Sequence, residues 1–136
     1  MLITSYDAKD CVIQVGDTYI TGVGEDMITF EKEEAYFEPK VGAQGDTIKS
    51  MINNPVHTIT LTIQSTSPQK AYLLNLLGQR ENFPVWVQNY HLAERFGGTQ
   101  CAITEMPSVS RGVEADDLEF NITVFDGKLE NWDAWA

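Results

Sequence analysis

The chain has 136 residues, 43% hydrophobic and 21% charged, a composition typical of one globular domain rather than a disordered or fibrous chain. Twenty acidic residues against nine basic ones give a formal net charge of −11, which argues against specific DNA or RNA binding because that affinity is built from lysines and arginines that neutralise phosphates. No apolar run approaches the roughly 18 residues of a membrane span, and the start MLITSYDAKDC has no signal-peptide pattern, so we expect folding in a reducing cytosol.

The first predicted elements are short β-strands. Alternation over Cys11–Val15, the turn signal Gly16-Asp17 and a further extended stretch to residue 21 predict a hairpin. Met27–Glu31 predicts another strand, with Thr29 and Glu31 on one face. We expect Cys11 and the distant Cys101 to be free, buried cysteines, with a disulfide formed outside the cell as the alternative.

Residues 32–56 show no clean periodicity and predict a long loop. Loops of this length are uncommon in compact domains and are usually functional or disordered. Disorder is a poor explanation here, because the segment holds Tyr36, Phe37, Val41, Ile48 and Met51. We therefore expect this loop to cover an apolar surface, either of its own domain or of another copy.

The clearest strands are residues 57–64 and 118–125. In each, apolar residues alternate with polar ones, so one face should pack in the core and the other should be polar. His57 falls on the apolar side, where a hydrogen-bonded structural histidine is expected.

A single helix is predicted at about 68–78, capped by Ser67 and opened by Pro68, with Gly78 at its end. Phe83–Val87 predicts a strand that is apolar, and buried, on both faces. Gly97-Gly98 predicts a turn, and residues 100–106 a further strand. The sum is a mainly β fold of sandwich or barrel type with one helix, in a single domain spanning 1–136.

The sequence contains no convincing catalytic or metal-binding constellation. His57 and His91, the two histidines, lie far apart, and no serine sits in a nucleophile elbow. Glu31, Glu33 and Glu34 lack the spacing of a calcium loop. We therefore predict no enzymatic activity, no cofactor and no metal.

Residues 16–46, GDTYITGVGEDMITFEKEEAYFEPKVGAQGD, resemble the tail tube proteins of contractile-tailed bacteriophages. The continuation supports the resemblance: a turn containing Asn54-Pro55, then TITLTIQSTSPQKAYLLNLL over residues 58–77. The similarity runs from Asp10 to Leu77, and the strand at 118–125 is compatible with it. Residues 89–99 match no pattern of the family.

The resemblance implies a structural subunit that forms hexameric rings stacked into a tube, with strands contributing to a β-barrel that closes across subunits. Such a tube conducts DNA during ejection without specific binding. The implied partners are further copies of the chain, the sheath, baseplate and tape-measure proteins. The implied location is the tail of the virion, after assembly in the bacterial cytoplasm. Phage-tail-like bacteriocins and, more distantly, type VI secretion tubes contain similar subunits.

Two other functions stay open. One is a related ring component of the tail or baseplate, such as a tube initiator or terminator. The other is a monomeric β-sandwich binding module, for instance for carbohydrate, with Trp86, Trp132 and Trp135 as candidate contacts.

Three groups of residues are candidates for assembly. An inter-ring stacking loop is predicted at Tyr36, Phe37, Pro39, Val41, Gly42, Ala43, Gln44 and Gly45. The wall of the lumen is predicted at Thr58, Thr60, Thr62, Gln64, Glu119, Asn121 and Thr123. A C-terminal docking contact is predicted at Trp132 and Trp135.

Overall fold

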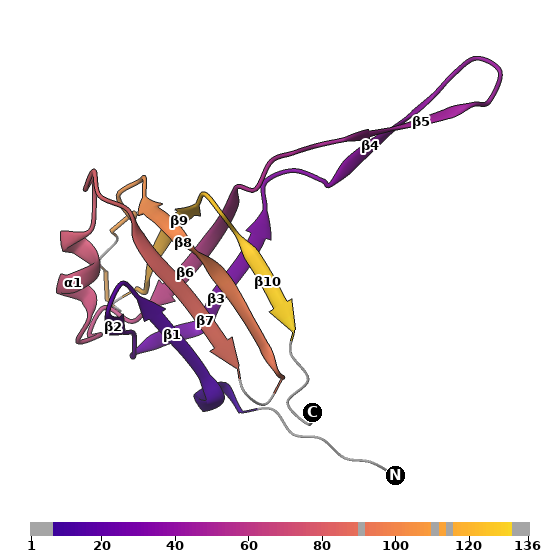
Figure 1. Ribbon diagram of the computed structural model, residues 1–136. Coiled ribbons are helices and arrows are strands. Elements are labelled where there is room, and N and C mark those ends of the chain that lie inside the picture. Colours follow the sequence, from indigo (N-terminus) through magenta and orange to yellow (C-terminus); the bar gives the residue numbers. More distant parts are fainter. Residues whose placement is uncertain (1–6, 90–91, 110–111, 114–115, 132–136) are drawn as a thin grey trace, which may run out of the picture.

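The computed structural model describes residues 7–89, 92–109, 112–113 and 116–131. It is built from antiparallel strands and one short helix, which confirms the mainly β prediction (Figure 1). The main sheet consists of β1 Cys11–Val15, β2 Thr18–Tyr19, β3 Val23–Lys32, β6 His57–Ile63, β7 Phe83–Asn89, β8 Glu94–Ile103, β9 Leu118–Val124 and β10 Lys128–Asn131. A separate pair is formed by β4 Phe37–Val41 and β5 Thr47–Met51, and the helices are α1 Lys70–Asn75 and a 3-10 turn at Ala8–Asp10.

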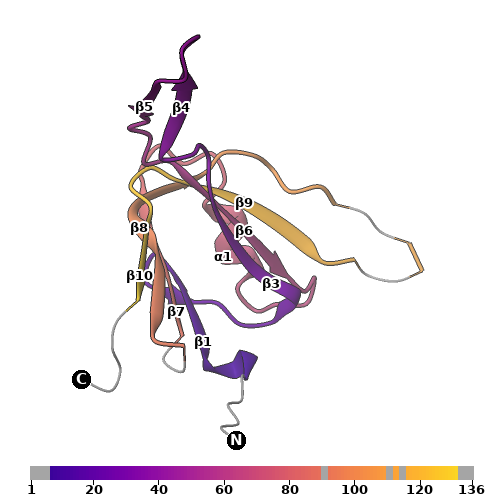
Figure 2. The same ribbon diagram turned by 90° about the vertical axis from the view of Figure 1, so that its right-hand side faces the viewer.

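The main sheet has the strand order β2-β1-β7-β8-β9-β6-β3 and is strongly curled into a half-barrel (Figures 1 and 2). The long strand β8 has two partners on one of its edges. Its first part, from Glu94 to Gly97, pairs with β10, and its last part, from Cys101 to Ile103, pairs with β9. Strand β10 therefore pairs with β8, in the interior of the strand order, and not with β2 or β3 at its two ends.

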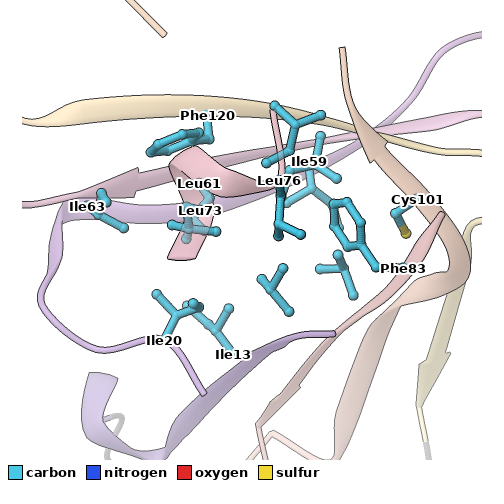
Figure 3. Packing of buried hydrophobic residues seen from close by; sticks show 14 of the residues in the cluster. Ile13, Ile20, Ile59, Leu61, Ile63, Leu73, Leu76, Phe83, Cys101 and Phe120 are labelled. Atoms are coloured by element: carbon cyan, nitrogen blue, oxygen red, sulfur yellow. The ribbon is translucent and has the colours of Figure 1, made fainter. Parts of the chain in front are cut away.

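The core fills the concave side of the curled sheet. Alternate residues of β1, β6, β7 and β9 are buried, as the period of a strand requires. Helix α1 lies over this side and inserts Leu73 and Leu76 between the strands (Figure 3). Phe120 is fully buried and is the largest of the fully buried side chains. Burial of these apolar side chains is the main force that holds the curl together.

The helix is shorter than the predicted 68–78. It begins at Lys70, and Ser67 does not cap it in the expected way. The Ser67 hydroxyl instead donates to the carbonyl oxygen of Thr21 at 2.7 Å, and the Gln69 side chain accepts from the Thr21 amide at 2.8 Å. The polar residues before α1 therefore join the helix to the link between β2 and β3.

Two other predictions were wrong in detail. Strand β7 alternates between buried and exposed residues, so it is not buried on both faces; Pro84 is exposed and Trp86 is half-buried. Gly97 and Gly98 do not form a turn but lie inside β8. A Cβ on Gly97, whose φ is +135°, would lie 2.0 Å from the carbonyl oxygen of Val85. The glycine thus permits a close approach to β7 rather than a chain reversal.

The predicted long loop at 32–56 is largely a β-hairpin that projects from the half-barrel (Figure 1). We call residues Tyr36–Ile52 the arm. The Ile52 amide donates to the Tyr36 carbonyl at its base, and the Gly42 amide donates to the Asp46 carbonyl at its tip. No helix among the described residues is long and apolar enough to cross a bilayer.

Candidate assembly surfaces

A continuous polar face covers the convex side of β6 and β9. Thr58, Thr60 and Thr62 are paired with Thr123, Asn121 and Glu119, respectively, and the Thr60 hydroxyl donates to the Asn121 side chain at 3.3 Å. Gln64 is exposed directly after β6. The residues predicted to face the lumen therefore lie together on one face of the sheet.

Strand β3 extends this face by two residues outside the predicted set. Thr29 is paired with Thr60, and Glu31 with Thr58, and both side chains are exposed. The signal was present in the sequence, because the alternation over 27–31 puts Thr29 and Glu31 on the side opposite to Ile28 and Phe30. We define the polar face as Thr29, Glu31, Thr58, Thr60, Thr62, Glu119, Asn121 and Thr123; its charged residues are both acidic.

The arm has two different faces, which follow from its register. Phe37 is paired with Met51, Pro39 with Lys49, and Val41 with Thr47, so these six share one face. We call this the apolar face of the arm. Val41 is 66% exposed and Met51 61%, and the Lys49 ammonium lies 4.1 Å from the centre of the Phe37 ring. The opposite face carries Glu38, Lys40, Ile48 and Ser50.

The tip of the arm is the turn Gly42-Ala43-Gln44-Gly45, in which Gly45 has a φ of +91°. Together with Tyr36, Phe37, Pro39 and Val41, these residues are exposed. The predicted stacking residues are therefore brought together on one projecting element and do not fold back over their own core (Figure 2).

A cleft of about 620 Å³ opens at the root of the arm. His57 lines it but is a structural residue: its Nδ1 lies 2.7 Å from the Pro55 carbonyl oxygen, and its ring stacks on Phe30 with 4.7 Å between centroids. A Cβ on Gly127 would fall 2.0 Å from that Nδ1. This confirms the hydrogen-bonded structural histidine that was expected, whereas His91 lies outside the described residues.

The half-barrel leaves sheet edges open. Within the described residues, β3 pairs only with β6, and β10 pairs only with β8. Strand β10 is exposed along its whole length, and Leu129 on it is 66% exposed. Open edges present unpaired backbone groups and are a template for pairing with another chain.

A second cleft, of about 470 Å³, lies between β9 and the β8–β9 loop, residues 104–117. We call it the end cleft; it is lined by Glu105, Met106, Pro107, Ser108, Asp116, Asp117, Glu119 and Asn121. Met106 and Val109 on this loop are highly exposed. The strand predicted over residues 100–106 was too long: β8 ends at Ile103, and Glu105 and Met106 belong to this loop.

The described residues do not bring together three or more histidine, cysteine or acidic side chains in a way that could hold a metal ion. Cys11 and Cys101 are both free thiols; Cys101 is buried as expected, whereas Cys11 is only half-buried. Burial raises the pKa of Cys101 to about 12, which suppresses its nucleophilic form. The tryptophans of the predicted C-terminal contact, Trp132 and Trp135, lie outside the described residues.

No protein-family model matches the sequence, and no curated protein matches it. The solved structures that share its fold include the following three. The PVC sheath/tube terminator of an extracellular contractile injection system, in the extended state, aligns with a TM-score of 0.63 and 15% identity over 96% of this chain and 99% of that one. A chain of the PVC sheath-tube complex in the extended state aligns with a TM-score of 0.66 and 14% identity, over 94% of this chain and 93% of that one. The tube-terminating cap of the anti-feeding prophage aligns with a TM-score of 0.60 and 11% identity, over 97% of this chain and 96% of that one. At these identities the likeness establishes the fold of the chain, a fold found in the tube region of contractile injection systems.

Proposed function

We propose that this chain is a non-enzymatic, ring-forming component of the tube region of a contractile tail or injection system. The observation that carries the proposal is the combination of a half-barrel with open edges and an exposed arm. The outer edges of β3 and β10 have no strand partner among the described residues, and neighbouring copies arranged in a ring would pair such edges and join their sheets across subunits. The shared fold with terminator, tube-complex and cap chains points in the same direction.

Within such a ring, the polar face is the surface we assign to the lumen. Threonine has high β propensity, and its neutral hydroxyl offers a phosphate backbone no ionic contact. The acidic residues Glu31 and Glu119 on this face would repel DNA or an anionic cargo rather than retain it. A passing polyanion would therefore meet a wall without a binding site.

One candidate position is an end ring. Two of the three solved structures are a sheath/tube terminator and a tube-terminating cap, and each is covered over nearly its whole length. This supports the terminator alternative of the sequence analysis better than the tube subunit. In this position the arm would contact the last ring of a tube built from another protein.

The other candidate position is the tube subunit itself. The sequence resemblance over residues 10–77 favours it, as does the likeness to a chain of the sheath-tube complex, which has the highest TM-score of the three. In this position the sheath and further copies of this chain would be the partners, and the tail would be assembled in the bacterial host.

Assembly of the purified protein tests the proposal and separates the positions. Native mass spectrometry should detect a closed ring at high concentration, and a chain that stays monomeric at every concentration would contradict the proposal. Negative-stain microscopy then distinguishes the two positions. A tube subunit should form stacked tubes alone, whereas an end ring should remain a single ring and bind to the ends of preformed tubes.

A further inference from the structure

The cleft at the root of the arm, which we call the root cleft, combines apolar and basic side chains. Its volume of about 620 Å³ falls within the roughly 300–1,000 Å³ typical of ligand pockets. Its apolar surface comes from Tyr36, Ile52, Pro55 and Leu129, and its basic residues are Lys32 and Lys128. None of the residues that line it is acidic. A ligand that is both apolar and acidic would therefore meet complementary groups and no like charge from the wall.

The contacts within the root cleft leave one of its two lysines available. The Lys32 ammonium donates to the Glu34 carbonyl at 2.6 Å and lies 4.8 Å from the centre of the Tyr36 ring. Lys128 is exposed, and the ion pair found among the described residues, Arg95–Glu130, does not include it. Tyr36 and Leu129 are also highly exposed, at 69% and 66%. The cleft thus presents apolar surface beside a lysine with no acidic partner in the described part of its own chain.

Strand β10 leads the chain away from its own root cleft. Lys128 lines the cleft at the start of the strand, and Asn131 at its end lies about 10 Å further on. Asn131 is paired with Glu94, at the end of the main sheet that lies opposite to the arm (Figure 1). The residues that follow Asn131 in the sequence therefore start at the far end of the sheet from the cleft.

These last residues have the chemistry that the root cleft lacks. We call residues 132–136, with the sequence WDAWA, the C-terminal segment. Its two tryptophans, Trp132 and Trp135, belong to the residue type that most often dominates the energy of protein interfaces. Tryptophan is also the preferred aromatic partner of a lysine ammonium. Asp133, between them, is opposite in charge to Lys128.

We propose that the C-terminal segment of one copy docks in the root cleft of a copy in the adjacent ring, with its tryptophans on the apolar wall and Asp133 beside Lys128. The segment and the cleft start from opposite ends of one chain, so the contact can repeat head to tail. This proposal rests on the proposed function, and it favours the tube-subunit position within it. It concerns the contact between rings, whereas ring closure depends on the sheet edges.

Removal of the tryptophans tests the apolar part of the contact. Trp132→Ala with Trp135→Ala should weaken end-to-end association of rings by at least about tenfold, since large aromatic anchors carry most of the energy of such contacts. Tyr19→Ala is the control: it removes an aromatic side chain that is 59% exposed and does not line the cleft, and it should have less than about a threefold effect. Association is measured by sedimentation velocity and negative-stain microscopy, and ring formation by native mass spectrometry.

Charge exchange tests the polar part. Lys128→Glu should weaken the association by at least about tenfold, because the contact is repeated by every subunit of a ring. Lys70→Glu makes the same charge change on α1, away from the cleft, and should have less than about a threefold effect. Addition of Asp133→Lys should restore the association of Lys128→Glu rings. The same addition to Lys70→Glu should weaken the association instead.

Cross-linking shows which copy supplies the segment. Asn53, which lines the root cleft and is exposed, is changed to cysteine in one preparation, and Ala134 is changed to cysteine in another, both with Cys11→Ser. Oxidation of the mixed preparations should give disulfide-linked dimers of Asn53→Cys with Ala134→Cys chains. A disulfide that forms only within single chains carrying both cysteines would show that the segment occupies its own cleft, and would overturn the proposal. Folding of each variant is checked by its thermal unfolding.

The outcomes separate the two proposals. Wild-type rings that never associate end to end, association that survives the loss of both tryptophans, or failure of Asp133→Lys to rescue Lys128→Glu would each overturn the docking proposal while leaving ring formation intact. Absence of rings from the wild-type protein would instead overturn the proposed function.

Discussion

The carboxylate of Asp126 accepts hydrogen bonds from both the backbone amide and the hydroxyl of Thr99, the former at 3.0 Å. It also accepts one from the Gln100 amide at 2.9 Å. Thr99 and Gln100 lie in β8 between the residues that pair with β10 and those that pair with β9. Neither of these two strands provides a backbone carbonyl for their amides. One side chain therefore satisfies the backbone donors at the point where β8 changes partner.

Removing the charge of Asp126 should destabilise the protein. Asp126→Asn retains the size but weakens the bonds to Thr99 and Gln100, and we expect a loss of about 1–2 kcal/mol of unfolding free energy after allowing for solvent exposure. Urea denaturation checks this. Asp46→Asn at the tip of the arm is the control and should change stability little, because the Asp46 side chain is exposed and no hydrogen bond to its carboxylate is seen among the described residues.

The same carboxylate predicts a dependence on pH. Burial alone would raise the pKa of Asp126, but the hydrogen bonds from Thr99 and Gln100 outweigh it and hold the pKa below its ordinary value of 3.8. The stabilisation is therefore complete above about pH 3.8 and is lost as the pH falls through the folded-state pKa. The difference in stability between wild type and Asp126→Asn should shrink over that range. A constant difference down to pH 2 would contradict this assignment.

The buried side of β9 should govern stability and the polar side should not. Phe120→Ala removes the largest fully buried side chain and should cost about 3–5 kcal/mol. Thr123→Ala, on the polar face of the same strand, should cost less than about 1 kcal/mol. Thermal and urea unfolding of the two variants provide the measurement, and equal losses would show that the two faces are wrongly assigned.

The two cysteines should differ in reactivity. Cys101 is fully buried and has a pKa of about 12, whereas Cys11 is half-buried. A thiol reagent at pH 8 should modify Cys11 in the folded protein and Cys101 only after unfolding. Titration with a chromogenic disulfide should therefore count one thiol in native wild type and none in native Cys11→Ser. Labelling of both at equal rates would show that the sheet opens around β8.

The lumen assignment can be tested with DNA. Thr60→Lys with Thr62→Lys adds two positive charges to the polar face and leaves the core face unchanged. Assemblies of this variant should retain double-stranded DNA in a salt-dependent way, because each lysine can release counterions from the phosphates. Asn75→Lys with Gln79→Lys, near α1, is the matched control. Equal retention by both variants would show that the polar face does not border the lumen.

The sequence predicted the alternating strands well, because β1, β6 and β9 each bury one face and therefore show a period of two. The hairpin of the arm was missed for a physical reason. Its residues are exposed on both faces, and Ile48 and Met51, three apart in β5, point to opposite sides, so no burial period marks the strand. Gly97 was misassigned because a glycine needed for a close approach cannot be told from one needed for a turn.

The candidate surfaces were predicted unevenly. The residues of the polar face on β6 and β9 were identifiable because each lies between buried residues of its own strand, as Thr60 does between Ile59 and Leu61. The end cleft was not, because Met106 and Asp117 become neighbours only when the β8–β9 loop returns beside β9. Open edges on β3 and β10 also depend on strand order, which no local pattern encodes.

The long span between β6 and β9 has a consequence for how the protein is made. Thr60 and Asn121, which meet in the middle of the sheet, are 61 positions apart in the sequence. During synthesis the sheet cannot close until β9 has left the ribosome, and contacts this distant in sequence form slowly. The arm is local and can pair early. Nascent copies would therefore expose the arm before their main sheet has formed. Electrostatic repulsion from the net charge of −11 would oppose their association until then.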